Sequence, residues 1–341
     1  MDPRLGLALL QRDPLQHLIQ VVEHAEKLGY TNFWYGNEKF YRDPWVGLAV
    51  AAQHSTQIRL GTFIQDPYTL HPALTAVAIA TLDELSQGRA VLLLGAGGGG
   101  GQPLDYQRYK PVVALREAIQ VIRQLFNGDK VHFEGEIVRF LGGNLHFPVR
   151  ADIPIYVASR GNMVLRMAGE MADGVMIATY ATPRGVEHAL KRIDLGLERS
   201  GRSRSDIRLI SRVDTWIDRD RQLAREAVRK MVAGFITTSY PDMGFVKAVG
   251  LELSSELQAV LAKKDREYSH ANAHLVPDEV IDAFAWTGTV EDVARQIAGV
   301  VQLGISEITV LLHPPEGKNE LEAMRLLAQE VMPLVGEMGN N

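Results

Sequence analysis

The chain has 341 residues, of which 46% are hydrophobic and 23% charged, and 36 Lys and Arg against 41 Asp and Glu leave a formal net charge of −5. Because it contains no cysteine, it can form no disulfide, thiolate metal site or iron–sulfur cluster, and it has no cysteine nucleophile. The mild negative charge, spread in both signs along the chain, argues against a nucleic-acid-binding surface, which needs a clustered basic excess.

Apolar runs and helical patterns alternate along the first part of the chain. Strands are expected at Leu5 to Leu10 and at residues 32–35, 58–63 and 90–94. The dipeptides Asp-Pro at 13–14 and 43–44 and His-Pro at 71–72 place proline where a helix begins. The fourth strand is continuously apolar, which is typical of a strand buried on both faces of a parallel sheet. We therefore predict four strand-then-helix units here.

The second half continues this alternation with interruptions. Four more strands, for eight in all, are expected at residues 155–158, 175–178, 207–217 and 307–312. Helices are expected near residues 163–171, 183–200, 219–235, 290–303 and 319–334. Residues 130–147 alternate around Gly135 as a hairpin does, and residues 241–285 indicate extra helices. We interpret these two segments, together with 95–110, as insertions into a single domain spanning 1–341.

Eight strand-then-helix units with right-handed crossovers can close into a barrel or spread as an open, doubly wound sheet. No strand followed by GxGxxG opens the chain, and loops of small residues follow several different strands. Both observations favour closure, so we predict an α/β fold of the (β/α)8, or TIM-barrel, class with insertions. In such a barrel the loops after the strands meet at one end, where active sites lie.

The first polar signal follows the second strand, where Glu38, Lys39, Arg42 and Asp43 stand beside two aromatic residues. Opposite charges held in a partly dry cleft shift pKa values and orient polar ligands, so this cluster could bind or protonate a substrate. It could equally be a solvated turn in which Asp43 caps the next helix. Both interpretations stay open.

Glycines mark the ends of the third and fourth strands. Gly61 and Thr62 interrupt an apolar run, which indicates a bulge, a close backbone approach to something flat, or simple barrel curvature. Six of the seven positions 95–101 are glycine, which supplies no side chain for packing and loses most entropy on ordering, so this backbone turns tightly, touches a ligand or forms a flexible linker. No Gly-Lys-Ser or Gly-Lys-Thr follows, which disfavours a nucleoside triphosphate. His71 is expected beside a helix cap rather than as a base.

The turn after the fifth strand, Ala158 to Asn162, leads directly into a helix near Met163. Backbone N–H groups at a helix N-terminus, the helix dipole, a serine hydroxyl and an arginine together make an anion site. We predict phosphate binding here, with simple capping as the alternative. The chain has neither HExxH nor GxSxG, the signatures of a zinc protease and of a serine hydrolase.

Four stretches of the chain resemble the luciferase-like monooxygenase superfamily, a group of (β/α)8 barrels that bind FMN or the deazaflavin coenzyme F420. They are FWYGNEKF, the long segment from Ile58 to Gly98, KPVVALREAIQVIRQL, and IPIYVASRGNMVLRMAGEMADGV. Within the superfamily, DPYTLHPA and ASRGN are most similar to the subgroup that contains methylenetetrahydromethanopterin reductase, which uses the deazaflavin.

The resemblance implies a cofactor site made of four segments. The end of the third strand, expected to support the flavin ring, is Gly61, Thr62 and Phe63. The end of the fourth strand, expected to border the ring or its tail, is Gly95, Ala96, Gly97 and Gly98. The turn expected to hold the cofactor phosphate is Ala158, Ser159, Arg160, Gly161 and Asn162. The next strand end, expected near the same pocket, is Ala178 and Thr179, followed by Tyr180.

One position departs from the family pattern. Luciferases and several deazaflavin-dependent dehydrogenases carry a functional histidine at the end of the second strand, where this chain has Glu38. Glu38 is therefore the candidate catalytic residue. It could act as an acid or base if burial raises its pKa toward neutrality, or it could be a structural ion paired to Arg42 or Lys39.

Three functions follow from the resemblance. We expect hydride transfer between coenzyme F420 and a small organic substrate, with the protein supplying orientation and a dry pocket. The alternatives are an FMN-dependent monooxygenase served by a flavin reductase, and a non-catalytic flavin-binding barrel. A homodimer is expected, as is common in the family. With no apolar stretch long enough for a membrane span or signal peptide, we expect a cytoplasmic location.

Overall fold

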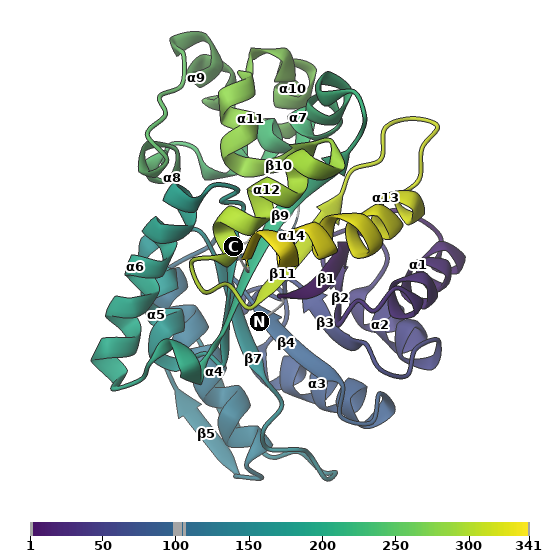
Figure 1. The fold of residues 1–341 in the computed structure, drawn as a ribbon. Coiled ribbons are helices and arrows are strands. Elements are labelled where there is room, and N and C mark those ends of the chain that lie inside the picture. The colour runs from purple at the N-terminus through teal and green to yellow at the C-terminus, as the bar shows by residue number, and fades with distance from the viewer. Residues whose placement is uncertain (1–2, 98–103, 105–106, 340–341) are drawn as a thin grey trace. The chain divides into compact units, whose positions relative to one another are not determined.

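The computed structural model describes residues 3–97, 104 and 107–339 (Figure 1). Its main sheet has nine strands in the order β10-β9-β11-β1-β2-β3-β4-β7-β8, and β9 also pairs with β8. All the strands except β10 therefore form a closed ring of eight, while β10 pairs with the last four residues of β9. This connectivity is the predicted (β/α)8 barrel and excludes the open sheet.

The eight strands of the ring are those expected from the sequence, to within one residue at each end. They are β1 (Arg4–Leu9), β2 (Asn32–Gly36), β3 (Arg59–Phe63), β4 (Ala90–Leu94), β7 (Ile155–Ser159), β8 (Gly174–Ala178), β9 (Arg208–Ile217) and β11 (Glu307–Leu312). The ninth strand, β10 (Ala285–Gly288), was not predicted. Its four residues are too few to display a pattern, and they follow directly on the inserted helices.

The helices connect these strands, and those in the described ranges are too short or too polar to cross a bilayer. They are α1 (Leu15–Lys27), α2 (Pro44–Gln53), α3 (Pro72–Leu85), α4 (Pro111–Phe126), α5 (Asn162–Met171), α6 (Pro183–Ser200), α7 (Arg221–Ser239), α8 (Gly244–Ala248), α9 (Ser255–Leu261), α10 (Arg266–Ala271), α11 (Asp278–Phe284), α12 (Val290–Val301), α13 (Glu320–Leu326) and α14 (Met332–Gly339). Short helices of other types are the 3-10 turns Arg204–Asp206 and Ala273–Leu275 and the π-helical turn Leu327–Val331.

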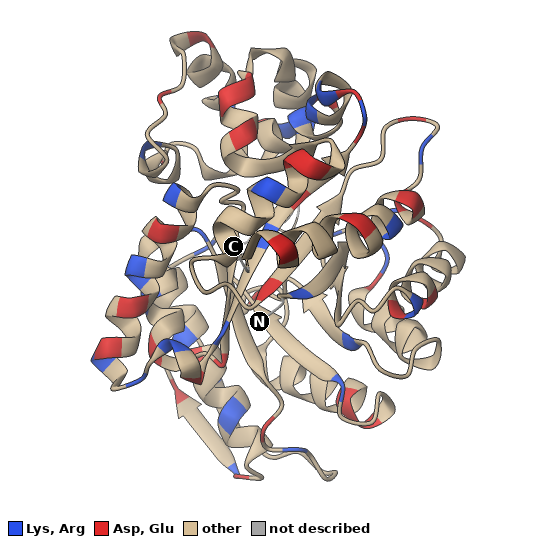
Figure 2. Ribbon diagram, viewed as in Figure 1, with Lys and Arg blue, Asp and Glu red and all other residues tan. Residues whose placement is uncertain are grey.

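The chain divides into two compact units. The first unit comprises residues 6–176 and 192–208. Its strands β2, β4 and β7 carry no charged residue (Figure 2) and bury their apolar side chains almost completely. Continuous apolar strands of this kind are expected in a parallel sheet that helices cover.

The predicted hairpin insertion is confirmed in the first unit. Strands β5 (Val131–Glu134) and β6 (Arg139–Gly143) pair in antiparallel fashion. The buried carboxylate of Glu117, on α4, accepts hydrogen bonds from the backbone N–H groups of Glu136, Ile137 and Val138 at 2.7, 2.9 and 2.8 Å. One α4 side chain thus satisfies the three donors of the hairpin turn.

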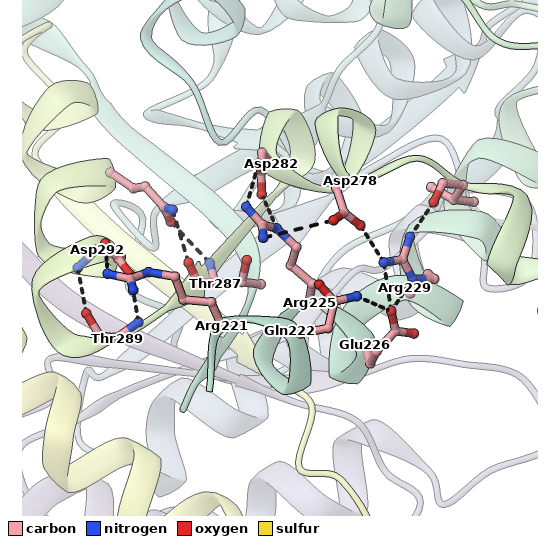
Figure 3. Close-up of polar contacts among 12 residues, drawn as sticks. Arg221, Gln222, Arg225, Glu226, Arg229, Asp278, Asp282, Thr287, Thr289 and Asp292 are labelled. Atoms are coloured by element: carbon pink, nitrogen blue, oxygen red, sulfur yellow. Dashed lines mark hydrogen bonds and ion pairs between the residues drawn. The ribbon is translucent and has the colours of Figure 1, made fainter. Parts of the chain in front are cut away.

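The second unit comprises residues 1–5, 177–191 and 209–341 and contains the predicted inserted helices. Helices α10 and α11 pack beside α7 (Figure 1). Arg221, Arg225 and Arg229 are spaced four residues apart on α7 and therefore share one face. This arginine ladder pairs with carboxylates of α12 and α11 (Figure 3): Arg221 with Asp292, Arg225 with Asp282 and Arg229 with Asp278, at 2.6, 2.9 and 2.6 Å.

Candidate cofactor and catalytic site

The ends of β2, β3 and β4 are joined by hydrogen bonds centred on Asn37. Its backbone N–H donates to the carbonyl of Phe63 at 2.8 Å, and its side-chain amide donates to the carbonyl of Ile64 at 3.2 Å and to Oε1 of Gln65 at 3.0 Å. The peptide between Phe63 and Ile64 is cis. The backbone carbonyl of Gln65 in turn accepts a hydrogen bond from the N–H of Gly95 at 3.0 Å. The segment after β3 is therefore held against the strand ends on both sides.

Close packing against neighbouring strands explains why position 61 is a glycine. It pairs with Trp34 of β2 in unbroken register. On the other side Gly61 pairs with Val91 and Gln65 with Leu94, so the segment after Gly61 holds one residue more than β4 opposite it, which is the bulge considered from the sequence. A Cβ on Gly61 would lie 2.4 Å from Cζ3 of Trp34 and 2.7 Å from the carbonyl oxygen of Val91. The flat group that approaches this backbone is thus the indole of Trp34. Thr62 is buried, with Oγ1 3.3 Å from the carbonyl of Leu93.

The glycine-rich end of β4 also permits close packing. A Cβ on Gly95 would lie 2.7 Å from Cγ2 of Ile64, so the missing side chain leaves room for the segment after β3. Ala96 is half-buried, and Gly97 has a φ of +77° and accepts a hydrogen bond from Arg108 at 3.0 Å. Gly98, predicted to border the cofactor, lies outside the described residues.

The predicted phosphate turn connects β7 to α5. Ala158 is buried, and Oγ of Ser159 accepts the N–H of Gly161 at 3.0 Å. The N-cap residue Gly161 provides no side-chain cap, so the N–H groups that open α5 are not occupied in that way. Gly161 and Asn162 are exposed. A turn of this form suits an anion, and the role of these residues, including Arg160, stays a prediction.

Glu38 lies beside an arginine that the sequence analysis did not name. Its carboxylate lies 3.6 Å from Nη2 of Arg12, with 28% of the side chain exposed. The side chain of Gln11 binds both the N–H and the carbonyl of Glu38 at 3.3 Å. Arg42 donates to the carbonyl of Arg12 at 2.8 Å and Lys39 lies beside another carboxylate, and the suggested pairing of Glu38 with either of them stays a prediction.

The partner of Lys39 is Asp66, a residue that sequence reasoning missed. Nζ of Lys39 lies 3.0 Å from Oδ2 of Asp66, and the two side chains are 16% and 2% exposed. The Asp66 carboxylate also accepts the N–H groups of Tyr68 and Thr69 at 2.9 and 2.8 Å. The signal for this role was the Asp-Pro-Tyr-Thr turn, since aspartate favours such side-chain-to-backbone turns. The pair holds an ammonium group at the end of β2.

Two other polar residues are structural. Asp43 accepts the N–H groups of Trp45 and Val46 at 2.9 and 3.0 Å and caps α2, which confirms the capping interpretation. Nδ1 of His71 accepts the N–H of Ala73 at 3.1 Å at the start of α3. Its position as a cap, rather than as a base, is as predicted.

The second unit contains Ala178 and Thr179, at the end of β8. Thr179 has a φ of +66°, is 2% exposed and donates its N–H to the carbonyl of Arg212 at 2.9 Å. Arg212 forms a two-pronged ion pair with Asp214, both contacts at 3.1 Å, and Nε2 of His313 lies 2.7 Å from Oδ1 of Asp214. Sequence reasoning missed this cluster, although His313 directly follows an apolar strand, as the other polar signals do.

Electrostatics fix the charge of Asp214. Burial alone would raise its pKa, but the charge of Arg212 and the hydrogen bond from His313 outweigh burial and hold the pKa at about 2. Asp214 is therefore an ionised carboxylate at neutral pH, enclosed by the second unit. Such a group orients and stabilises whatever donates to it.

A family model described as luciferase-like monooxygenase matches residues 3–307 of this chain. The chain belongs to the luciferase-like monooxygenase family. This luciferase-like protein is 33% identical to the 5,10-methylenetetrahydromethanopterin reductase of Archaeoglobus fulgidus, over 97% of this chain and 99% of the relative. It is 28% identical to an F420-dependent glucose-6-phosphate dehydrogenase of Intrasporangium calvum, over 92% and 94% of the two chains.

Among solved structures, the coenzyme F420-dependent tetrahydromethanopterin reductase of Methanopyrus kandleri superimposes on this luciferase-like protein with a TM-score of 0.87. The two chains are 28% identical, and the match covers 98% of this chain and 99% of the other. These findings confirm the resemblance noted from the sequence and the barrel fold.

Proposed function

We propose that this protein is an oxidoreductase that transfers a hydride between coenzyme F420 and a small organic substrate. The observation that carries the proposal is likeness over the whole chain: the reductase of Archaeoglobus fulgidus matches 97% of it, and the F420-dependent reductase of Methanopyrus kandleri has a TM-score of 0.87. Many unrelated functions share the barrel fold, so a common barrel alone says little about the cofactor. The similarity here also includes the insertions and the strand ends, and it therefore supports a shared type of cofactor.

The residues of the first unit fit such a cofactor. The start of α5 has no side-chain cap on its N–H groups and follows Arg160, which together suit a phosphate. When bound, the deazaflavin supplies a two-electron hydride carrier that reacts poorly with oxygen. The chain's own part is to bind, orient and exclude water.

Glu38 remains the proposed acid or base at the end of β2. Its backbone is fixed through Gln11, while its carboxylate is 28% exposed and so can be reached by a ligand. A Glu38→Gln variant keeps the shape and removes the proton-accepting group. If Glu38 transfers a proton, the turnover rate of this variant should fall by roughly 10²-fold or more, while its affinity for the cofactor stays unchanged. Equal turnover in wild type and variant would assign Glu38 to structure alone.

The test of the cofactor is an equilibrium titration of the purified protein with F420 and with FMN, read as fluorescence quenching under identical conditions. We expect a tight response to F420 and a weaker one to FMN. A tight response to FMN alone, with oxygen consumption in the presence of a flavin reductase, would replace the proposal with the monooxygenase alternative. Binding without turnover on any substrate would support a non-catalytic barrel.

The phosphate turn has its own variant. Arg160→Gln removes one positive charge beside the start of α5, and charged hydrogen bonds contribute about 1.5–3 kcal/mol. The dissociation constant for F420 should therefore rise roughly 10- to 100-fold. Arg199→Gln is the matched control, because Arg199 is 63% exposed and pairs with Glu170 elsewhere in the unit. An equal rise of the dissociation constant in the two variants would show that the cofactor phosphate does not bind at this turn.

We also propose a homodimer formed through α2 and α3. These neighbouring helices are apolar on nearly all faces, and they expose Val46, Leu74 and Val77 to the extent of 56%, 56% and 39%. Helices that are apolar all round are normally covered. Light scattering should give twice the chain mass for wild type and one chain mass for Leu74→Glu. Leu223→Glu, on a 52% exposed leucine of α7, should leave the dimer intact.

A further inference from the structure

A buried chain of polar groups ends at the carboxyl end of β11. Arg212 and Asp214 lie on β9, and His313 is the first residue after β11. The three side chains are 10%, 4% and 9% exposed, so the cluster is nearly enclosed. A buried cluster of charged groups costs desolvation free energy. The cluster lies at the carboxyl end of a strand, where barrel enzymes carry out their chemistry. A function at this end would explain why the protein keeps a cluster that costs desolvation free energy.

The strand register fixes the direction of these side chains. Thr309 is paired with Arg212 and Leu311 with Asp214. Because alternate residues of a strand share a face, His313 continues the face of Thr309 and Leu311. The contact between His313 and Asp214 shows that this is also the face of Asp214.

Asp214 determines which nitrogen of His313 holds a proton. An ionised carboxylate only accepts hydrogen bonds, so Nε2 at 2.7 Å must be the protonated nitrogen. In the neutral ring, Nδ1 then carries the lone pair. Within the part of the chain that the structure describes, no hydrogen bond to Nδ1 is found. His313 therefore presents a basic nitrogen at the end of a fixed carboxylate–imidazole pair, the arrangement that prepares a histidine for proton transfer.

Trp216 gives an independent sign of a ligand. It is 2% exposed and follows Asp214 by two positions on β9, which places it on the same face one step nearer the carboxyl end. Its indole N–H has no hydrogen-bond partner among the described residues. Buried donors without an acceptor are uncommon and costly. An oxygen or nitrogen of a bound molecule would satisfy it.

From these observations we propose that His313, as the alternative to Glu38, is the catalytic proton acceptor and donor for a substrate that exchanges one proton with each hydride, such as an alcohol or an amine. Asp214 and Arg212 are positioning residues for its ring, and the indole N–H of Trp216 binds a heteroatom of the substrate. The inference rests on the proposed hydride transfer and names its substrate class.

With oxidised deazaflavin bound, the C–H bond of the substrate would break and its electron pair would pass as hydride to that cofactor, which would be reduced. The O–H or N–H bond breaks, its proton goes to Nδ1 of His313, and a C=O or C=N bond forms in the substrate. The imidazolium, stabilised by Asp214, then releases the proton to solvent. In the reverse direction His313 returns the proton.

The first test needs no cofactor. In the unliganded protein labelled with ¹⁵N-histidine, NMR should assign the proton of neutral His313 to Nε2. Asp214→Asn, whose amide can donate to Nε2, should move the proton to Nδ1 in part or entirely. Native protein treated with diethyl pyrocarbonate should be modified at His313, as mapped by mass spectrometry. A wild-type ring protonated at Nδ1, or a His313 that resists modification, would overturn the proposal.

The second test measures turnover on a panel of alcohols and amines with F420. His313→Gln should lower kcat by roughly 10²- to 10⁴-fold, with unchanged F420 affinity and thermal stability near wild type. His54→Gln is the matched control, because His54 pairs with Glu23 at 3.1 Å but is 40% exposed. It should retain full turnover.

The outcomes separate the two proposals. If wild type binds no F420, the proposed function fails, and the NMR and modification results still decide whether His313 is prepared for proton transfer. If wild type turns over and His313→Gln does so within a few-fold, the role of His313 is refuted. If His313→Gln does not fold, wild type modified at His313 with diethyl pyrocarbonate takes its place. The modified protein should lose turnover but still bind F420, and hydroxylamine should restore the turnover. Turnover that survives modification of His313 would refute its role in proton transfer.

Discussion

The ion pair of Arg212 and Asp214 should make the stability of the second unit sensitive to acid. The pKa of Asp214 is about 2 in the folded protein against 3.8 for a free side chain. That difference corresponds to about 2 kcal/mol, at 1.36 kcal/mol for each pKa unit. Because the folded pKa is the lower one, this stabilisation is complete above about pH 4 and is lost as the pH falls toward 2. At pH 3 about half of it should remain.

The assay compares wild type with Asp214→Asn by urea denaturation at pH 7 and pH 3. At pH 7 the variant should be less stable by about 3–5 kcal/mol, since it removes the ionised partner of the buried guanidinium of Arg212. At pH 3 the difference should shrink by about 1 kcal/mol, because wild type has lost part of the same contribution. Arg212→Met combined with Asp214→Asn should recover part of the loss.

The control for this experiment is Asp152→Asn. Asp152 also pairs with an arginine, Arg150, but its side chain is 84% exposed. It should change stability by less than about 0.5 kcal/mol at either pH. If the difference between wild type and Asp214→Asn is the same at pH 7 and pH 3, Asp214 does not titrate as argued and the reasoning is refuted.

Three further predictions concern packing and attachment. Gly61→Ala should lower stability by about 1–3 kcal/mol, because its Cβ would lie 2.4 Å from the Trp34 ring. Gly161→Ala is the control and should change stability little, because its Cβ would meet nothing closer than 3.6 Å. Equal melting temperatures for the two variants would contradict the packing argument. Glu117→Ala should speed amide hydrogen exchange in the hairpin turn, since it removes the acceptor of three N–H groups; unchanged exchange would show that the turn does not depend on it. Arg229→Ala should make the inserted helices cleave faster in limited proteolysis, because the ion pair with Asp278 is lost.

The barrel could be predicted because its signals are local. A continuous apolar run such as Ala90 to Leu94 predicts a buried strand without knowledge of its neighbours. Asp43 and His71 stand directly before a proline and act as caps in the structure, as the dipeptides indicate. Strand β10 was missed for the same reason: four residues after a helix carry too little local pattern.

The polar arrangement could not be predicted, because its partners are distant in sequence. Asp214 and His313 are 99 residues apart and meet only because β9 and β11 are adjacent in the sheet. For Glu38 the sequence offered only its neighbours Lys39 and Arg42 as ion-pair partners, whereas Arg12, which the structure places beside it, comes from the loop before α1. At Gly61 the sequence indicated a close approach to something flat, but only the structure identifies Trp34.

The arginine ladder of α7 has a consequence for exchange of the segment that follows α7. Helix α11 rests on α7 partly through Arg225 and Arg229, which reach its Asp282 and Asp278. Charged pairs at a surface tolerate sequence change around them better than interlocked apolar side chains do. A foreign segment that replaces the stretch after α7 and retains these two aspartates should therefore dock on the same helix, so that this stretch can be exchanged as a unit without redesign of the barrel.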